Sequence, residues 1–322
     1  MKDKINQFPD VVRIEPVGKC NFKCLHCPTG VRPNNRALLK KPEFHSIIDQ
    51  FSDANFIPRV VVLYHGGEST LNKNLTYYIK FLKEFGVAKT VVTTNASLLT
   101  EKLCNELVLA GLDELKVSFD GTSPDENNAI RVRGKFFENA NNIKTLCNVK
   151  KMLNRANPII KIGNIQVCDQ DTLNEMFKKN ASTNNPLDYE LTPPKYLTDF
   201  FADHYGDMEF RSFPAMVWPS FNDFSKYEPV LYGEQEVKYC SSLYETVTIL
   251  SNGDVVMCCY DLEGELVIGN AFEDNIFDIW NSDKYTKIRN DFTEAKYTSF
   301  CSKCNVVSPR YLVKKEIPLA TV

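Results

Sequence analysis

The sequence predicts an α/β protein: a partial (β/α)6 barrel of the TIM type, followed by a small C-terminal domain with a β-hairpin and a helix. Near-continuous apolar runs alternate with longer segments of helical periodicity, the pattern of buried parallel strands joined by crossover helices. Polar motifs directly follow several of these runs, as in barrels whose reactive groups gather at the carboxyl ends of the strands. Two separate groups of cysteines, one near each end of the chain, predict a second, smaller unit after the barrel.

Six apolar, β-rich runs supply the expected barrel strands, and helical patterns lie between them. Apolar residues at helical spacing predict the first helix, and Thr100 is a favourable N-cap for the third. The expected strands are 11–17, 60–64, 90–93, 114–119, 159–167 and 208–213. The expected helices are 43–51, 75–85, 101–110, 137–154 and 172–179.

The amino-acid composition limits the classes to which this protein can belong. The chain has 322 residues with 43% hydrophobic and 25% charged residues, as in an ordinary globular protein. A net charge of −3 gives no electrostatic reason to expect a nucleic-acid partner. The polar N-terminus resembles no signal segment, and the sequence has no apolar run long enough for a membrane span. Eleven cysteines are too sparse for a disulfide scaffold, so we expect metal binding in a reducing cytoplasm.

The first cysteine group directly follows the first expected strand. Cys20, Cys24 and Cys27 form a C-x3-C-x2-C pattern, which places three thiolates in one loop. Thiolates favour zinc or iron–sulfur clusters. Structural zinc normally takes four protein ligands, so a zinc site here would need a further one, for which His26 is the local candidate. A cubane cluster held by three cysteines instead leaves one iron free for an outside ligand, which suits catalysis.

This loop resembles the signature of the radical S-adenosylmethionine (radical SAM) enzymes, C-x3-C-x-aromatic-C, with His26 in the aromatic position. The resemblance implies a 4Fe-4S cluster on the three cysteines, with S-adenosyl-L-methionine bound at its open iron. One electron then cleaves the cofactor to a 5′-deoxyadenosyl radical, which abstracts hydrogen from an unactivated C–H bond. It also implies an electron donor such as flavodoxin or ferredoxin.

A Gly-Gly-Glu turn follows the second expected strand. Two glycines allow a close backbone approach, and the Glu68 carboxylate can accept hydrogen bonds from an ammonium group. Gly66, Gly67 and Glu68 resemble the family's Gly-Gly-Glu-Pro motif, which implies that they hold the methionine amino group. Ser69 stands where the family has proline. Taken alone, such a sequence is often only a turn.

Further motifs at later strand ends match the family in order. Asn95 lies in a sequence similar to the family's Thr-Asn-Gly, which places it near the ribose, and Ser118 precedes Asp-Gly, which places it near the cofactor. Arg131 is expected to pair with the methionine carboxylate, with Arg133 as the alternative. Gln166, on the fifth strand, is a candidate contact of the adenosyl group. Singly, each motif is equally explained as a polar strand end that satisfies a turn.

Residues 181–237 break the strand–helix rhythm. This segment is rich in proline and aromatic residues, which argues for a folded connection rather than polar disorder. Glu209 and Arg211, on the sixth strand, are candidates for the wall of the substrate pocket. Simple packing against the barrel is the alternative explanation for either residue.

The second cysteine group comprises Cys240, the adjacent Cys258 and Cys259, and a C-x2-C pair of Cys301 and Cys304. An Asn-Gly turn between two β-rich runs predicts a hairpin that returns Cys258 toward Cys240. A helix over 276–289 is expected before the C-x2-C pair. Four thiolates fit either zinc or iron.

This region resembles the auxiliary-cluster domains of radical SAM enzymes, named SPASM in the full form and twitch in the shortened form. Five cysteines imply one auxiliary 4Fe-4S cluster, held by Cys240, Cys258, Cys301 and Cys304. Cys259 is then either a hydrogen donor to a substrate radical or a buried spare thiol. The expected division is 1–180 for the radical SAM core, 181–237 for the last strand and connection, and 238–322 for the auxiliary domain.

The substrate is open at this level. The first strand begins almost at once, with no room before it for a peptide-recognition domain, which favours a small polar substrate such as a sugar or aminocyclitol, oxidised or epimerised. Modification of a ribosomal peptide is one alternative. A non-enzymatic iron–sulfur or zinc protein is the other.

Overall fold

The computed structural model describes residues 8–31, 36, 38–179, 190–221, 224–234 and 236–315. The expected boundary at 180/181, most of the N-terminal segment and the proline at position 186 lie outside the described residues.

One continuous sheet of nine strands organises the chain, in the order β12-β11-β10-β1-β3-β4-β5-β7-β8. The pairs from β10 through β8 are all parallel, whereas β10-β11 and β11-β12 are antiparallel. The strands are β1 (Val11–Ile14), β3 (Val60–Leu63), β4 (Lys89–Thr94), β5 (Glu114–Asp120), β7 (Ile159–Gln166), β8 (Met208–Pro214), β10 (Thr246–Ile249), β11 (Asp254–Val256) and β12 (Val267–Asn270). The six expected barrel strands are therefore all present, each with slightly different ends.

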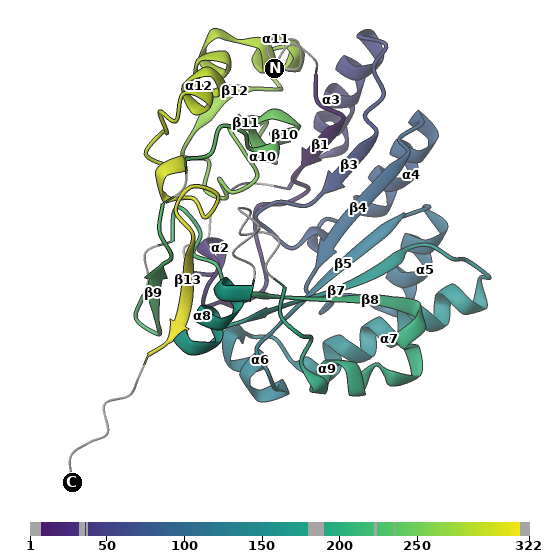
Figure 1. The fold of residues 1–322 in the computed structure, drawn as a ribbon. Helices are drawn as coiled ribbons and strands as arrows, with labels where there is room; N and C mark the ends of the chain where they lie inside the picture. The colour runs from purple at the N-terminus through teal and green to yellow at the C-terminus, as the bar shows by residue number, and fades with distance from the viewer. Residues whose placement is uncertain are drawn as a thin grey trace.

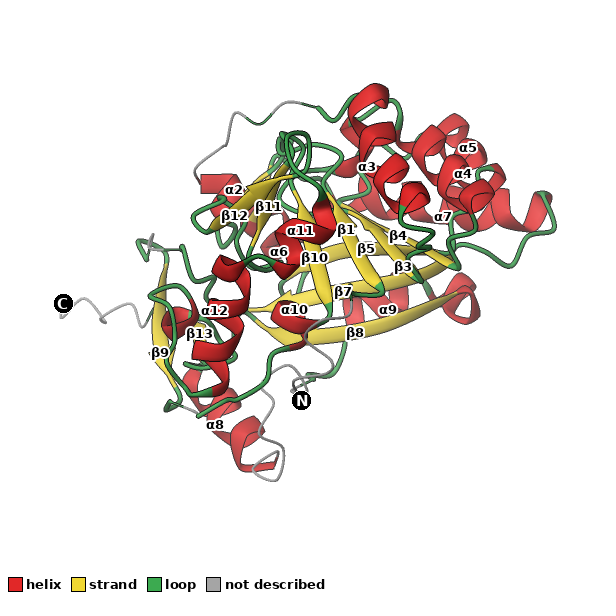
Figure 2. Cartoon of the chain, turned by 90° about the horizontal axis from the view of Figure 1, so that it is seen from above, coloured by secondary structure: helices red, strands yellow, loops and turns green. Residues whose placement is uncertain are grey.

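Helices cover the outer face of this curved sheet (Figure 1), and Figure 2 shows the same layers from above. The helices of the barrel half are α3 (Lys41–Asp53), α4 (Leu75–Phe85), α5 (Glu101–Leu109), α6 (Pro124–Ile130), α7 (Phe136–Met152), α8 (Gln170–Lys179) and α9 (Lys195–Phe200). The apolar face of α3 buries the side chains Phe44, Ile47, Ile48 and Phe51, as its spacing predicts. The main hydrophobic core lies between these helices and the strands.

The expected hairpin is present, and it does not stand apart from the barrel. Its first strand, β10, pairs in parallel with β1, so the auxiliary region extends the same sheet. The single helix expected over 276–289 is instead two helices, α11 (Ile276–Asn281) and α12 (Asp283–Thr293). Ser282 causes the break, because it has an extended backbone and its hydroxyl accepts from the Tyr285 N–H to cap α12.

A two-stranded ribbon, β9 (Tyr227–Leu231) with β13 (Arg310–Lys314), lies beside the far end of the sheet (Figure 1). Single bridges join it to the barrel, between Val313 and Cys168 and between Tyr311 and Met216. Short pieces complete the fold: β2 (Lys23–Cys24), α2 (Pro28–Val31), β6 (Arg131–Val132), α10 (Ser241–Tyr244) and three 3-10 turns. None of the helices in the described ranges is both long and apolar enough to cross a membrane.

Candidate active site

A cavity of about 250 Å³ opens at the carboxyl ends of the barrel strands. The strand ends and the first cysteine loop supply most of its wall, as expected for a parallel barrel. Its lining comprises Cys20, Phe22, Cys24, His26, Cys27, Gly30, Tyr64, Gly66, Gly67, Glu68, Thr93, Thr94, Asn95, Ser118, Asp120, Arg131, Ile165 and Trp218. The sequence motifs separated along the chain therefore meet around one space.

The cysteine loop is fixed to the barrel by short backbone contacts. Cys24 pairs with Arg131 across the β2-β6 ladder, so the loop is joined directly to the residue predicted to bind a carboxylate. Gly30 approaches the same strand so closely that an added Cβ would lie 2.5 Å from the Cys24 carbonyl oxygen. Burial raises the pKa of Cys20 to about 11 and that of Cys24 to about 12. Such thiols ionise readily only when a cation replaces the lost water, as a metal centre does.

The Gly-Gly-Glu turn packs against the backbone that leads into this loop. The Glu68 N–H donates to the Lys19 carbonyl at 2.9 Å. A Cβ on Gly67 would lie 2.1 Å from the Val17 carbonyl oxygen, so only glycine fits at this position. Ser69, which stands in place of proline, is buried, and its hydroxyl donates to the Leu63 carbonyl at 2.8 Å. This bond ties the turn back to the end of β3.

The Glu68 carboxylate joins two strand ends. Its Oε1 accepts from Thr70 and from the Thr94 hydroxyl, the latter at 2.7 Å. Its Oε2 accepts from the Asn95 N–H at 2.7 Å. Oε2 keeps capacity for another donor beside the Asn95 N–H, because a carboxylate oxygen has two lone pairs. The Asn95 side chain points along the cysteine loop, donating to Asn21 at 2.8 Å.

A buried ion pair lies across the cavity. The Arg131 guanidinium contacts Asp120 Oδ2 at 3.0 Å, and His26 Nε2 lies 3.9 Å from the same oxygen. Burial lowers the pKa of His26, so its ring is neutral near pH 7. Within the described part of the chain, His26 Nδ1, Asp120 Oδ1 and Arg131 Nε are buried without a hydrogen-bond partner. Orphaned polar atoms around a cavity indicate a polar ligand.

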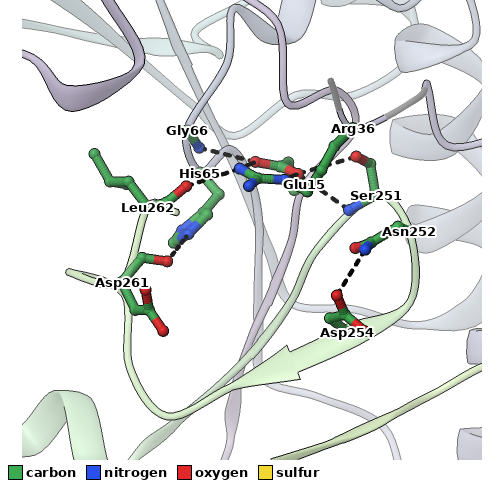
Figure 3. A network of polar contacts seen from close by, with 9 residues as sticks. All are labelled: Glu15, Arg36, His65, Gly66, Ser251, Asn252, Asp254, Asp261 and Leu262. Atoms are coloured by element: carbon green, nitrogen blue, oxygen red, sulfur yellow. Dashed lines mark hydrogen bonds and ion pairs between the residues drawn. The ribbon is translucent and has the colours of Figure 1, made fainter. Parts of the chain in front are cut away.

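Glu15, at the carboxyl end of β1, links the cavity to the auxiliary region (Figure 3). Its side chain is fully buried, and its oxygens accept from Arg36 at 2.8 Å, from the Gly66 N–H at 3.1 Å and from Ser251. Arg36 also donates to the Leu262 carbonyl at 2.9 Å. Burial alone would raise the pKa of Glu15, yet the Arg36 bond and its neighbours hold it below the ordinary value. The carboxylate therefore fixes three segments together as an ion.

His65 adds a second connection in the same place (Figure 3), because its Nε2 lies 3.0 Å from the Asp261 carbonyl. Burial lowers the pKa of this histidine to about 4, so the ring is neutral and donates from Nε2. This contact joins the end of β3 to the segment that follows Cys258 and Cys259.

All five cysteines of the second group lie close enough together to influence one another's ionisation. Cys258, Cys301 and Cys304 are buried, and Cys240 is half-buried. Burial raises the pKa of Cys258, and the neighbouring Cys259, Cys304 and Cys301 raise it further. Cys259 Sγ lies 3.3 Å from the Ser242 hydroxyl. The structure thus brings together every cysteine predicted there, including the spare one.

Two family profiles match the chain. The profile described as the radical SAM superfamily covers residues 14–154, and the iron–sulfur cluster-binding SPASM domain covers 240–305. This chain belongs to the radical SAM superfamily and carries a SPASM-type domain. The first match implies a 4Fe-4S cluster with S-adenosylmethionine, and the second implies auxiliary iron–sulfur binding.

Solved structures agree with this fold. The chain superposes on BtrN, crystallised with AdoMet and 2-DOIA, with a TM-score of 0.57 and 17% identity, covering 93% of this chain and 94% of that one. Streptococcus suis SuiB bound to S-adenosylmethionine gives 0.57 and 20%, covering 88% and 68%. At these identities the likeness shows the fold alone.

Curated relatives match about half of the chain. A GTP 3′,8-cyclase of Petrotoga mobilis is 26% identical over 51% of this chain and 50% of its own length. A probable GTP 3′,8-cyclase of Methanocaldococcus jannaschii is 30% identical over 46% and 49%. The chain spans about half the length of the curated relatives it matches.

The cavity of this radical SAM protein has the donors and acceptors that the cofactor needs. Three cysteines, Glu68, Asp120 and Arg131 all line it, and Asp120 and Arg131 each have a buried polar atom without a partner in the described residues, which fits a cluster with a bound amino acid moiety. Ser118 also lines the cavity. Arg131 is buried there, whereas Arg133 lies at a turn with a positive φ of 75°.

Four predicted residues are not among those that line the cavity. Gln166 is not among the lining residues, because its amide donates to the Thr192 carbonyl at 3.1 Å, and the preceding Ile165 lines the cavity instead. Glu209 pairs with Lys161 at 3.3 Å, and Arg211 pairs with Glu190. Cys259 also lies outside the wall, although the adjacent Tyr260 ring lies 5.4 Å from the Trp218 ring, which lines it.

The sequence reasoning missed three residues of this site. Asp120 stood in the Ser-x-Asp-Gly motif without a role, yet it holds Arg131. Glu15 carried a signal, since it is an acidic residue at the end of an apolar strand. Trp218 has no local pattern to identify it, because only the return of its segment over the barrel brings it to the cavity.

Proposed function

We propose that this radical SAM enzyme abstracts a hydrogen atom from a small polar substrate, such as a sugar or an aminocyclitol, and thereby oxidises or epimerises it. The observation that carries the proposal is the single cavity shared by the cysteine loop, the Gly-Gly-Glu turn and the two later strand-end motifs. Beyond these motifs, Tyr64, Ile165 and Trp218 contribute large, mainly apolar side chains to the cavity wall.

The cluster and S-adenosylmethionine, when bound, supply a 5′-deoxyadenosyl radical through one-electron cleavage. In this proposal Cys20, Cys24 and Cys27 hold the cluster. Glu68 Oε2 accepts a hydrogen bond from the methionine ammonium, and Arg131 offers its unpaired Nε to the methionine carboxylate. These charge-assisted bonds orient the cofactor so that its reactive carbon faces the substrate.

Three further residues complete the cofactor assignment. Asn95 and Ser118 lie at neighbouring strand ends, where they can bond the ribose and the adenosyl group. The neutral His26 ring shields the cluster loop from water beside Asp120. Gln166 is the candidate contact of the adenosyl group, and for that role its side-chain amide would have to release the Thr192 carbonyl.

In the auxiliary region, Cys240, Cys258, Cys301 and Cys304 would hold a second cluster, a redox group suited to oxidation. Cys259 is the candidate hydrogen donor for epimerisation, with oxidation as the leading outcome. We also propose the division at 180 and 237, an external donor such as flavodoxin or ferredoxin, and a reducing cytoplasm. Eleven free cysteines support the last point.

Anaerobic reductive cleavage tests this proposal. Protein reconstituted with iron and sulfide, then supplied with dithionite and S-adenosylmethionine, is expected to release 5′-deoxyadenosine. Deuterated sugars, aminocyclitols and model peptides then separate the substrate classes, because only the true substrate transfers deuterium to 5′-deoxyadenosine. Cleavage without deuterium from any sugar or aminocyclitol, together with transfer from a peptide, would replace the small-molecule assignment.

A further inference from the structure

The barrel interior below the cofactor cavity is unusually rich in cations. Alternate residues of a strand point to the same side of a sheet. Asp120 and Ser118 of β5 line the cavity, so Lys116 and Glu114 lie on the same, inner side of the sheet. Lys116 lies two residues before Ser118 along the strand, and Glu114 lies four residues before it. The β5-β7 register places Lys161 beside Lys116.

One buried glutamate forms ion pairs with three lysines in this interior. Glu114 is 2% exposed and lies 2.7 Å from Lys89, 3.3 Å from Lys161 and 3.6 Å from Lys116. Lys161 has a second carboxylate, Glu209, at 3.3 Å. Three ammonium groups therefore share two carboxylates. Lys116 makes the longest of these contacts, and its side chain is 53% accessible, so solvent reaches the interior at this level.

Arg13 adds a fourth cation from β1. Its NH1 lies 3.4 Å from the Tyr64 carbonyl, and its Nε is buried without a hydrogen-bond partner in the described ranges. No carboxylate of the described residues forms an ion pair with it. The register from β1 through β3 and β4 to β5 places Arg13 on the same inner face of the sheet as Glu114 and Lys116. Burial lowers the pKa of Lys116, Glu114 raises it and Arg13 lowers it. Two cations on one inner face repel each other, and a bound anion would offset that repulsion.

We propose that Arg13 and Lys116 bind an anionic group of the substrate, a phosphate or a carboxylate, in the barrel interior beneath the cofactor cavity. This inference rests on the proposed function, because it says which charge the substrate of that reaction carries. Two residues of a strand span roughly 6.6 Å, so an anion at the level of Lys116 leaves the rest of a small molecule beside Ser118. The anion anchors one end, and the reacting C–H bond lies at the other.

Direct binding of simple anions tests this assignment without any radical chemistry. Reconstituted protein is titrated anaerobically with tripolyphosphate and with citrate in a calorimeter at low salt, and the stronger of the two identifies the anionic group. We expect saturable binding, weakened roughly tenfold or more in Arg13→Gln and in Lys116→Gln, because each loses a charge-assisted bond. Arg13→Lys is expected to recover part of the affinity.

Lys102→Gln is the matched control, because this lysine is exposed on the outer helix α5 with its side chain 86% accessible. Its affinity for either anion should equal that of the wild type. Iron content and thermal melting report whether each variant is folded, and Lys116→Gln leaves Glu114 two lysine partners if Arg13→Gln does not fold. No saturable binding to the wild type, or equal affinity in Lys116→Gln, overturns the inference. Formation of 5′-deoxyadenosine by the wild type independently tests the proposed function.

Discussion

The two cysteine groups use the same ligand chemistry in opposite settings. Cys20 and Cys27 are half-buried, Cys24 is buried, and all three line a cavity with Asp120 and Arg131, each of which has a buried polar atom without a partner in the described residues. In the SPASM-type domain Cys258, Cys301 and Cys304 are buried and Cys240 is half-buried. Three thiols at a polar cavity leave room for an outside ligand, whereas four thiols, three of them buried, can close their own coordination. Surroundings, rather than cysteine spacing alone, thus separate an open centre from a closed one.

The two regions are also mechanically joined. The sheet runs without a break from β5 through β1 into β10, and Glu15 bonds the Gly66 turn on one side and Ser251 on the other. These bonds tie the turn that carries Glu68 to the SPASM-type domain. The predictions below separate the two regions, beginning with the largest expected effect.

Removal of the first cysteine group should abolish cofactor chemistry and leave the second group intact. The triple variant with Cys20, Cys24 and Cys27 replaced by alanine is expected to keep about half the iron and to form no 5′-deoxyadenosine. Iron analysis and chromatography of the reaction measure both quantities. Cys104→Ala, at a buried isolated cysteine, serves as the control and should keep full iron. Retained cleavage in the triple variant would show that the open centre lies elsewhere.

Glu15→Gln should weaken the connection between the regions. Breaking one partner of a buried ion pair costs about 3–5 kcal/mol, because it leaves Arg36 without its counter-ion. The loss is measured as the free energy of unfolding in denaturant, and Glu84→Gln, an exposed helix position, should change it by less than about 0.5 kcal/mol.

The loss of stability in Glu15→Gln should depend on pH in a definite direction. The pKa of Glu15 is held below its ordinary value of 4.5, so the stabilisation it provides is present above that pH and is lost as pH falls through the lowered value. The difference between wild type and Glu15→Gln should therefore be full at pH 7 and shrink below about pH 4.5. A difference that stays constant down to acid unfolding would contradict the ionised state of Glu15.

The fold was largely predictable because burial leaves a local signature. Apolar runs gave all six barrel strands, and the amphipathic face of α3 matched the observed core. The break at Ser282 was missed since the apolar residues on both sides continue a helical rhythm, and only the hydroxyl cap reveals the new start. The pairing of β10 with β1 is a long-range contact that no local pattern encodes.

The site was predictable where residues lie in short motifs at strand ends. Glu68, Asn95, Ser118 and Arg131 all line the cavity as the motif order implied. Gln166 was predicted to contact the adenosyl group, but the neighbouring Ile165 lines the cavity instead. The interior cations Arg13 and Lys116 were overlooked because they come from different strands, and only the register of the sheet places them on one inner face.

Glu68→Gln should weaken S-adenosylmethionine binding roughly ten- to a hundredfold without changing iron content, since a charge-assisted bond contributes about 1.5–3 kcal/mol. Equilibrium binding of the cofactor to reconstituted protein measures this. Glu43→Gln, at the capping box of α3 and remote from the cavity, is the matched control. Unchanged affinity in Glu68→Gln would remove this residue from the cofactor site.

The smallest effect is expected at Cys259. Cys259→Ala should keep the iron content of the wild type, whereas Cys258→Ala should lose the iron of the auxiliary centre. If Cys259→Ala loses iron and Cys258→Ala does not, Cys259 is the cluster ligand and Cys258 is the spare thiol. Once a substrate is known, turnover in deuterated water tests the donor role. Full activity of Cys259→Ala, with no deuterium in the wild-type product, would eliminate epimerisation.

Electron paramagnetic resonance of the two reduced centres tests the contrast between open and closed cysteine groups most directly. Each centre is observed alone, in one variant that lacks Cys20, Cys24 and Cys27 and in another that lacks Cys301 and Cys304. Addition of S-adenosylmethionine should change the spectrum of the first-group centre, because an outside ligand joins its open iron, and should leave the auxiliary spectrum unchanged. A cofactor-dependent change at the auxiliary centre, with none at the first, would contradict the account.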